Sequence, residues 1–328
     1  MRVGIIGATG EVGRQMQICL SEQIDEIQEL RLFAIAKTAG TKRNFHKREE
    51  TVETVRIGCC DGLDDVVGAV SNALSKEYLP LIKESGALYI DNSSAFRLDE
   101  NVPLVVPEIN GEDALKNNGV IANPNCSTII TYMAVAAIHR ISPITRMIAT
   151  TFQAVSGAGA GGPIELHGEI QAIENGSVYE PKVFPAQIAY NCIPLIGSLN
   201  ENLYSTEEMK MQNEGRKIMH APGLAVTCTC VRVPVFRSHS ISVTLHTEDS
   251  VSIEDAENAI SRFPGVKLMK DKLPMPLETS DQDLVFVGRI RRDLTDTTGW
   301  TLGCCGDQIR KGAAANAVQI LAYVESHK

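Results

Sequence analysis

The chain has 328 residues, and its 44% hydrophobic and 22% charged content are ordinary for a globular protein of about two domains. Its formal net charge of −9 argues against nucleic acid as the main partner, because nucleic acid binds basic surfaces. No stretch approaches 18 apolar residues without a charge, and the apolar run at residues 3–6 follows Met1 and Arg2 with no long leader before it. We therefore expect neither a membrane span nor a secretory signal.

The first half of the chain alternates short apolar runs, typical of strands, with helical stretches. The expected strands are residues 2–7, 29–36, 66–70, 87–91 and 120–122, with expected helices between them that include residues 12–21 and 76–84. This βαβ rhythm predicts a parallel sheet with helices on both faces.

A glycine-rich turn follows the first expected strand and opens the first helix. Gly7, Gly10 and Gly13 let the chain turn tightly and let backbone N–H groups approach a pyrophosphate at the helix N-terminus. Their spacing is Gly-x-x-Gly-x-x-Gly rather than Gly-x-Gly-x-x-Gly. Their place at the start of a βαβ unit nevertheless favours dinucleotide binding over a plain strand-to-helix turn.

The end of the second expected strand bears on the choice between NAD and NADP. An acidic residue there would bind the ribose hydroxyls of NAD, but the segment at residues 34–40 contains no acid. Lys37 and Thr38 instead offer a charge and a hydroxyl to a 2′-phosphate. This pattern favours NADP, although Lys37 alone would also suit a solvated surface.

Arg97 lies in the loop that follows the expected strand at residues 87–91. Loops at the carboxyl ends of parallel strands form the ligand crevice of such a sheet. An arginine there can grip phosphate or carboxylate with its fork of donors, whereas in isolation a surface salt bridge explains it equally well.

Cys126 lies in the run Asn123-Pro124-Asn125-Cys126-Ser127-Thr128. The Asn-Pro pair breaks regular structure, and an apolar helical stretch follows, with Ser127 or Thr128 as the expected cap. The unpaired N–H groups of a helix start favour a thiolate and can hold an oxyanion. The pattern therefore indicates a nucleophilic cysteine, with a buried structural cysteine as the alternative.

Beyond residue 145 the pattern changes to longer alternating strands interleaved with helices. The expected strands are residues 147–155, 225–234 and 241–246, and the expected helices are 164–174, 206–219 and 253–263. This pattern predicts an α+β second domain. The Ala-rich helix expected at residues 312–325 should return to the first domain.

Polar residues cluster at the ends of these later strands. Gln153 precedes a glycine-rich loop at residues 156–162, which permits close approach of a ligand to the backbone or serves as a hinge. Arg232 and His239 flank Pro234, and histidine suits proton transfer near neutral pH. Taken alone, His239 is no better a candidate than His246.

The nine cysteines do not suggest a disulfide scaffold. Cys59-Cys60 and Cys304-Cys305 are adjacent pairs, and neighbours rarely bridge each other. No Cys-x-x-Cys pair occurs, so we expect no metal site. Free thiols in a reducing cytoplasm fit this usage.

Together these segments resemble the aspartate-semialdehyde dehydrogenases, and the resemblance runs through essentially the whole chain. Its most specific parts are residues 7–13, 91–97, 123–128, 153–159, 214–217, 232–240, 306–308 and 311–314. The resemblance implies a Rossmann-type NADP-binding domain at residues 1–127, completed by a C-terminal helix at 308–328. It also implies an α+β catalytic and dimerisation domain at 128–307, assembled as a homodimer or a dimer of dimers.

The reaction that the resemblance implies is the NADPH-dependent reductive dephosphorylation of β-aspartyl phosphate to aspartate β-semialdehyde, through a cysteine thioester. The resemblance also implies a place in the biosynthesis of lysine, threonine, methionine and isoleucine. Cys126 matches the nucleophile and His239 the acid/base. The residues that match substrate-binding positions are Arg97, Asn125, Gln153, Glu214, Lys217 and Arg232. Those that match cofactor-binding positions are Gly7, Thr9, Gly10, Glu11, Val12, Lys37, Thr38, Ser156, Gly157 and Gln308.

One segment departs from the family pattern, and two other functions remain as alternatives. Residues 68–73 stand where many members have a Ser-Ala-Gly-like loop, so the role of Asn72 stays open. An N-acetyl-glutamyl-phosphate reductase would share the nucleophile but would need no carboxylate for a free ammonium, so Glu214 favours the aspartyl substrate. A non-catalytic dinucleotide-sensing regulator would need the glycine turn but not the combination of Cys126, Gln153, Arg232 and His239.

Overall fold

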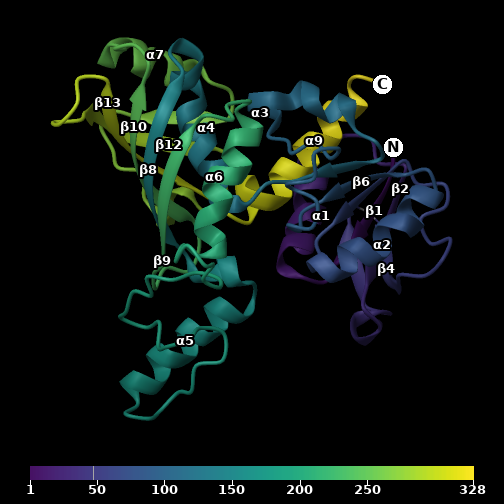
Figure 1. Ribbon diagram of the computed structural model, residues 1–328. Helices are drawn as coiled ribbons and strands as arrows, with labels where there is room; N and C mark the ends of the chain where they lie inside the picture. The colour runs from purple at the N-terminus through teal and green to yellow at the C-terminus, as the bar shows by residue number, and fades with distance from the viewer. Residues whose placement is uncertain (47) are drawn as a thin grey trace. The chain divides into compact units, whose positions relative to one another are not determined.

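The computed structural model describes residues 1–46 and 48–328, which divide into two compact units (Figure 1). The first unit comprises Met1–Pro124 and Ala313–Lys328, and the second comprises Asn125–Gly312. The chain thus enters the second unit directly before Cys126 and leaves it after Gly312. These limits lie a few residues from the boundaries expected at residues 127 and 307.

The first unit is built on a seven-stranded sheet with the order β3-β4-β2-β1-β5-β6-β7. The strands are β1 (Arg2–Ile6), β2 (Glu29–Ala34), β3 (Lys42–Phe45), β4 (Arg48–Thr54), β5 (Asp65–Gly68), β6 (Leu88–Asp91) and β7 (Val120–Ala122). All neighbours pair in parallel except β3 and β4, which are antiparallel at one edge. We did not expect β3 and β4, because they are mostly charged or polar and bury only Phe45 and Val52.

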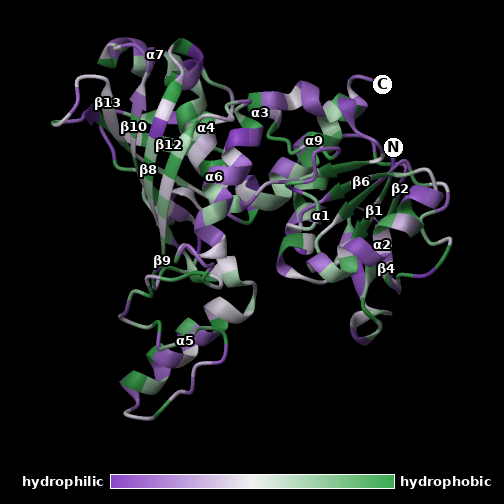
Figure 2. Cartoon of the chain, viewed as in Figure 1, coloured by the Kyte–Doolittle hydropathy of each residue, from purple (hydrophilic) through white to green (hydrophobic). Residues whose placement is uncertain are grey.

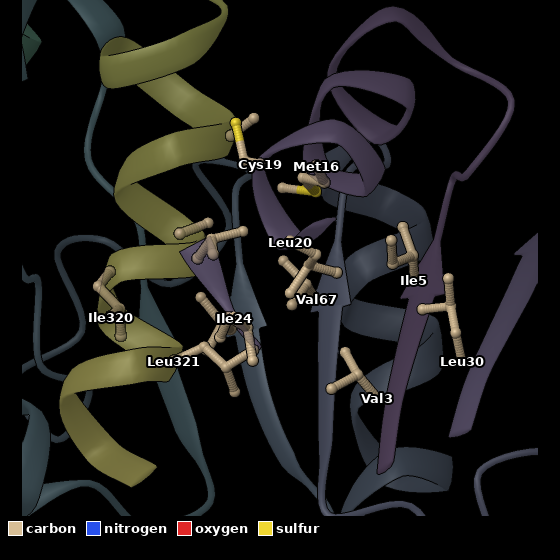
Figure 3. Packing of buried hydrophobic residues seen from close by; sticks show 14 of the residues in the cluster. Val3, Ile5, Met16, Cys19, Leu20, Ile24, Leu30, Val67, Ile320 and Leu321 are labelled. Atoms are coloured by element: carbon tan, nitrogen blue, oxygen red, sulfur yellow. The ribbon is translucent and has the colours of Figure 1, made fainter. Parts of the chain in front are cut away.

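Helices α1 (Glu11–Gln23) and α9 (Ala315–Glu325) pack together in the first unit, although they come from opposite ends of the chain. Figure 3 shows Leu20 of α1 beside Val67 of the sheet and Leu321 of α9 beside Ile24, and all four residues belong to one buried apolar cluster. Burying each such apolar side chain contributes about 1.5–3 kcal/mol. Helix α2 (Asn72–Glu84) lies between β5 and β6 in the chain.

The second unit is built on a six-stranded sheet with the order β11-β12-β13-β10-β8-β9. Its strands are β8 (Ile144–Gln153), β9 (Ala225–Arg232), β10 (His239–Thr247), β11 (Val266–Met269), β12 (Val285–Arg292) and β13 (Gly299–Gly306). Strands β11, β12 and β13 were missed in the sequence, because the arginines of β12 and the glycines of β13 interrupt the apolar alternation that marks a strand.

Helix α4 (Cys126–Ile141) is the central helix of the second unit. Residues 127–138 are buried without exception, and α4 packs against β8, β10, β12 and β13 as well as α6 (Thr206–Ile218) and α7 (Ile253–Arg262). A helix that is apolar all round is typical of such a core position. Figure 2 shows the contrast with α6, which is mostly hydrophilic.

Side chains of β8 alternate between the two faces of the second sheet. Met147 and Ala149 are buried, whereas Ile148 and Phe152 point to the opposite face and are 37% and 41% exposed. Helix α5 (Gly161–Glu174) follows the end of β8 and lies beyond that end of the sheet (Figure 1).

The predicted fold class, a Rossmann-type parallel sheet together with an α+β domain, is confirmed. Among residues 1–46 and 48–328, no helix is both long enough and apolar enough to cross a membrane.

Candidate active site

Cys126 is the first residue of α4, and Asn125 is the residue that caps this helix. The Oδ1 atom of Asn125 accepts hydrogen bonds from the backbone N–H groups of Ser127 at 3.1 Å and Thr128 at 3.3 Å. Our expectation that Ser127 or Thr128 would be the cap is therefore wrong, because the side-chain oxygen of Asn125, two positions before Ser127, accepts from both backbone donors. The consequence is that partly exposed Cys126 lies where helix N–H groups and the helix dipole favour a thiolate.

Strand topology brings three of the expected polar residues to one edge of the second sheet. Gln153 ends β8 and Arg232 ends β9, and the two residues are direct partners because these strands are parallel. His239 begins β10, which runs antiparallel to β8, so its position lies at the same edge. Residues separated by 86 positions in the chain are thereby placed within hydrogen-bonding range.

His239 is fully buried and faces Cys126, with 3.6 Å between its Nε2 and the cysteine Sγ. The backbone N–H of Ala154 donates to His239 Nδ1 at 3.1 Å. Because a backbone N–H can only donate, Nδ1 is the unprotonated nitrogen, and in the neutral ring Nε2 carries the hydrogen that faces sulfur.

The electrostatic surroundings keep His239 neutral. Desolvation is the largest effect, and together with the positive charge of Arg232 it lowers the pKa of His239 to about 3, although Glu207 acts in the opposite direction. The geometry therefore offers Cys126 a neutral N–H donor rather than an imidazolium.

Arg232 is buried, and its Nη1 donates to the backbone oxygen of Ala154 at 2.6 Å. Burial lowers the pKa of its guanidinium, which nevertheless stays a cation because arginine is so basic. The group is the one charged side chain on a cavity of about 520 Å³ whose other walls, within the described residues, include Ala158, Val183 and Phe184.

Gly157 of the glycine-rich loop lies against this pair of residues. A Cβ atom at Gly157 would lie 2.8 Å from Arg232 Nη1 and 3.1 Å from His239 Cε1, so any larger residue would displace them. Ser156 and Gln308 hold the loop, because Gln308 Nε2 donates to Ser156 Oγ while Gln308 Oε1 accepts from Ser238 N at 2.8 Å. These three predicted cofactor residues thus lie beside His239.

Helix α6 presents a polar stripe at heptad spacing, formed by Glu207, Lys210, Glu214 and Lys217. Glu214 is buried, and its Oε2 accepts a hydrogen bond from the backbone N–H of Asn125 at 2.7 Å. Lys217 follows one helical turn later and is half-buried. The stripe therefore connects α6 to the residue that precedes Cys126.

Glu207 is a site residue that the sequence analysis missed. Its Oε1 accepts hydrogen bonds from Asn125 Nδ2 at 3.0 Å and from Gln153 Nε2 at 3.2 Å. A signal was present, because Glu207 stands one heptad before Glu214, and residues seven apart share a helix face.

The expected dinucleotide turn in the first unit has the conformation that glycine allows. Gly7 has a φ of +86°, and a Cβ atom there would lie 2.3 Å from the backbone oxygen of Ala69. A Cβ at Gly13 would lie 2.2 Å from Gly7 O. Gly10 precedes α1, which begins with Glu11 and Val12. Within the described residues no side chain caps this helix, so the backbone N–H groups of its first turn lie at the end of the glycine turn. A cradle of this kind fits a pyrophosphate.

The remaining predicted cofactor residues of the first unit lie partly together. Thr9 Oγ1 is 3.1 Å from Thr38 Oγ1, so the first turn and the end of β2 meet. Lys37 is exposed in the short helical segment Ala36–Thr38. Asn72, whose role was open, exchanges hydrogen bonds with Ser94, including one from Ser94 N to Asn72 Oδ1 at 2.9 Å.

Arg97 belongs to the first unit, whereas the other expected substrate residues belong to the second. It is buried, and its Nη2 donates to the backbone oxygen of Asn92 at 2.9 Å. The loop after β6 is thereby fixed by the same side chain that we expected to bind phosphate.

Comparisons with known proteins extend over nearly the whole chain. Residues 2–117 match the description "Semialdehyde dehydrogenase, NAD binding domain", and residues 135–311 match "Semialdehyde dehydrogenase, dimerisation domain". Aspartate-semialdehyde dehydrogenases from a Synechocystis species and from Bacillus subtilis are each 42% identical to the chain, over 98% of it and 96% of the relative.

Solved structures agree with these sequence matches. The crystal structure of aspartate semialdehyde dehydrogenase II from Vibrio cholerae has a TM-score of 0.97 and 38% identity, covering 99% of this chain and 98% of that one. A structure of an enzyme with the same name from the same organism, complexed with ASA, also has a TM-score of 0.97, with 37% identity.

Proposed function

The chain belongs to the aspartate-semialdehyde dehydrogenase family, and from this premise we propose that its second unit performs the chemistry through Cys126 and His239. The activity is the reductive dephosphorylation of β-aspartyl phosphate to aspartate β-semialdehyde, a step of amino-acid biosynthesis. The observation that carries the residue assignment is the 3.6 Å approach of His239 Nε2 to Cys126 Sγ at the start of α4.

The chemistry starts with attack of the Cys126 thiolate on the acyl phosphate carbonyl. The N–H groups at the start of α4 and the Nε2–H of His239 stabilise the oxyanion, phosphate leaves, and a thioester remains on sulfur. A bound reduced nicotinamide dinucleotide supplies the hydride for thioester reduction. The resulting thiohemiacetal releases the aldehyde and restores the thiolate.

His239 handles the proton at the oxygen of these tetrahedral species. In the resting geometry its Nε2–H acts as a hydrogen-bond donor. Uptake of a second proton at Nδ1 would require loss of the hydrogen bond from Ala154 N, so proton exchange is coupled to movement at the end of β8.

The substrate amino acid is oriented by groups of opposite charge. The fork of Arg232 matches the planar α-carboxylate, and Glu214 matches the α-ammonium. Gln153 contributes its amide beside His239. Arg97 and Lys217 neutralise the charge of the phosphate. Asn125 caps the start of α4 and so fixes the position of Cys126.

The first unit, Met1–Pro124 with Ala313–Lys328, is proposed as the cofactor-binding domain, and the second as the catalytic and dimerisation domain. Gly7 and Gly13 leave room for the pyrophosphate, while Lys37 and Thr38 favour the 2′-phosphate of NADP. Ser156, Gly157 and Gln308 complete the cofactor set from the second unit.

We also propose a homodimer formed through the second unit. Ile148 and Phe152 lie on the exposed sheet face, and Tyr190 and Leu203 are 72% and 79% exposed in the segment after α5. Large apolar side chains exposed on a sheet face and in the segment beside it are typical of an interface between subunits. Sedimentation of the unmodified chain should give the mass of a dimer or of a dimer of dimers. Phe152→Asp should lower the mass of the assembly, because it places a charge in the proposed interface. Leu294→Asp, at a residue that is fully exposed between β12 and β13, is the control and should leave the mass unchanged. A monomeric unmodified chain would contradict the proposal.

The cysteines support a cytoplasmic location. All nine are free, and the closest pairs, Cys59–Cys60 and Cys228–Cys230, have Sγ atoms 3.7 and 3.8 Å apart. A disulfide requires about 2.05 Å between the sulfurs, so these pairs suit a reducing compartment.

The test of the proposed function is phosphate-dependent reduction of NADP by aspartate semialdehyde. Cys126→Ser should abolish turnover, and Glu214→Gln should weaken use of this substrate, because a free ammonium loses its carboxylate. Efficient use of N-acetyl-glutamate semialdehyde by the unmodified enzyme, or normal turnover by Cys126→Ser, would contradict the assignment.

A further inference from the structure

Glu207 is a buried carboxylate at the start of α6, with an exposed fraction of only 8%. Its Oε1 accepts from the amide nitrogens of Asn125 and Gln153, at 3.0 and 3.2 Å, and its Oε2 accepts from Lys210 Nζ at 2.9 Å. Lys210 lies one helical turn later, where its side chain is 30% exposed. One carboxylate therefore joins two residues that directly adjoin Cys126 and His239.

The surroundings keep Glu207 ionised. Desolvation is the largest single effect and raises its pKa, but the charge of Lys210 and the hydrogen bonds from Lys210, Asn125 and Gln153 together lower the pKa to about 2. An ionised carboxylate accepts hydrogen bonds and donates none. Both amides must therefore turn their nitrogens, not their oxygens, toward Glu207.

For Asn125, this orientation determines the cap of α4. With its nitrogen on Glu207, its Oδ1 faces Ser127 and Thr128, from which it accepts backbone hydrogen bonds. A reversed amide would set an NH₂ group against those two N–H donors and remove the cap. Glu207 thereby maintains the helix start on which Cys126 stands.

For Gln153, the same orientation determines what faces His239. Its Oε1 accepts from Thr151 Oγ1 at 2.9 Å, and its Nε2 lies 3.4 Å from His239 Nε2. His239 Nε2 carries a hydrogen, and the amide nitrogen of Gln153 cannot accept it. That hydrogen is therefore left to point at Cys126 Sγ. A reversed Gln153 amide would place its carbonyl oxygen there and draw the hydrogen away from sulfur.

We propose that Glu207 is a positioning residue for the reaction of Cys126, acting through Asn125 and Gln153. Its charge fixes the polarity of both amides, which fixes the helix cap beside the nucleophile and directs the Nε2–H of His239 to sulfur. This inference rests on the proposed function, because it requires Cys126 to be the nucleophile.

The first experiment replaces Glu207 with its neutral isostere and compares the neighbouring residue. Glu207→Gln should lower kcat by up to about 100-fold, the effect of misplacing reacting groups by about 1 Å. It should also slow alkylation of Cys126 by iodoacetamide in the absence of substrate. Glu208→Gln removes the same charge from the same turn, where Glu208 binds Ser205 N and Cys230 N. That control should lower Tm but leave kcat and alkylation near normal.

Equal losses of kcat and of alkylation rate in Glu207→Gln and Glu208→Gln would overturn the inference, because a helix-stabilising role would then explain both. Cys126→Ser separates this outcome from failure of the proposed function. If Cys126→Ser turns over normally, the proposed function fails; if it is inactive while the two glutamate variants behave alike, only the role of Glu207 fails.

A second variant keeps the test decisive if Glu207→Gln does not fold. Lys210→Met removes the largest influence that lowers the pKa of Glu207 but leaves both amide contacts. The pKa should therefore rise, so kcat should be near normal at about pH 8 and should fall as the pH decreases and Glu207 takes up a proton. The unmodified enzyme should lack this acid limb above about pH 5. A Lys210→Met profile parallel to that of the unmodified enzyme would contradict the inference.

Discussion

The turn that opens α1 in the first unit and the cluster around Cys126 in the second unit are built from different parts of the chain. In the turn, backbone approaches backbone, and Cβ atoms at Gly7 and Gly13 would lie 2.3 and 2.2 Å from carbonyl oxygens. In the cluster, side chains from α4, α6 and three strand ends meet through hydrogen bonds of defined polarity. A turn of this kind is sensitive to added volume, whereas the cluster is sensitive to the exchange of donors and acceptors.

Apart from replacement of Cys126 itself, His239→Ala should have the largest effect on turnover. Loss of a proton-handling group typically costs 10²–10⁴-fold in rate, so kcat should fall by about that factor with a modest change in KM. His246→Gln is the control, because His246 pairs with Asp293 and Asp296, at 3.9 and 3.3 Å, near the other end of β10. Steady-state kinetics would contradict the choice of histidine if the control lost kcat while His239→Ala kept it.

The same assignment predicts that kcat of the unmodified enzyme shows no ionisation of His239 at about pH 6.5, the pKa of an ordinary histidine. Burial lowers the pKa of His239 from 6.5 to about 3, so the ring gains its charge only in strong acid. A kcat limb at about pH 6.5 that is lost in His239→Ala would show that the ring is more accessible to water than its burial indicates.

Arg232→Lys should have the next largest effect. Lysine keeps the charge but loses the planar fork, and its Nζ cannot reproduce both the contact to Ala154 O and a bidentate grip on a carboxylate. We expect the KM for aspartate semialdehyde to rise by about 10–100-fold, with a smaller fall in kcat. Initial rates at varied substrate measure both, and a normal KM would remove Arg232 from substrate binding.

Gly13→Ala should perturb the first unit alone. The added methyl would meet Gly7 O and force the turn to shift, which should cost about 1–3 kcal/mol in the free energy of unfolding and raise the KM for NADP. Alkylation of Cys126 in the absence of cofactor should keep its normal rate. Urea unfolding measures the loss of stability, and the alkylation rate measures the reactivity of Cys126. Loss of that reactivity in Gly13→Ala would contradict the view that the glycine turn and the cluster around Cys126 depend on separate structural features.

Lys37→Ala should have the smallest effect. Lys37 is exposed, so its contact with a 2′-phosphate would be partly screened and worth about 1.5 kcal/mol. Binding of NADP should weaken by that amount while binding of NAD stays nearly constant. Titration with each cofactor decides the matter, because equal weakening of both would contradict a 2′-phosphate contact.

The same contrast explains how far each site could be predicted from the sequence. The glycine turn depends on residues within one short segment, so Gly7, Gly10 and Gly13 could be recognised with their neighbours β1 and α1. Strands β1, β2, β5, β6 and β7 were also predicted, because each is a short apolar run. The strand pair β3 and β4, which lies at one side of the sheet with β3 at its edge, was not predicted, because strands near a sheet edge tolerate charged residues.

The cluster around Cys126 was predictable only in part. Cys126, Glu214 and His239 could be named from family resemblance, but no local pattern shows which amide oxygen faces which donor. The cap at Asn125 and the role of Glu207 depend on a contact between residues 82 positions apart. Such polarity is a property of the folded network, and sequence periodicity alone places Glu207 only on the correct face of α6.

The most direct test of the central claim is the order in which the nine cysteines react with a slow alkylating reagent. We expect substoichiometric iodoacetamide, followed by peptide mapping, to label Cys126 first and to abolish turnover in proportion to that label. Cys192 is the informative competitor, because it is exposed but lies outside the cluster. If Cys192 or another cysteine were labelled first, with turnover lost in proportion to that label and Cys126 unmodified, the account of Cys126 as the nucleophile would be contradicted.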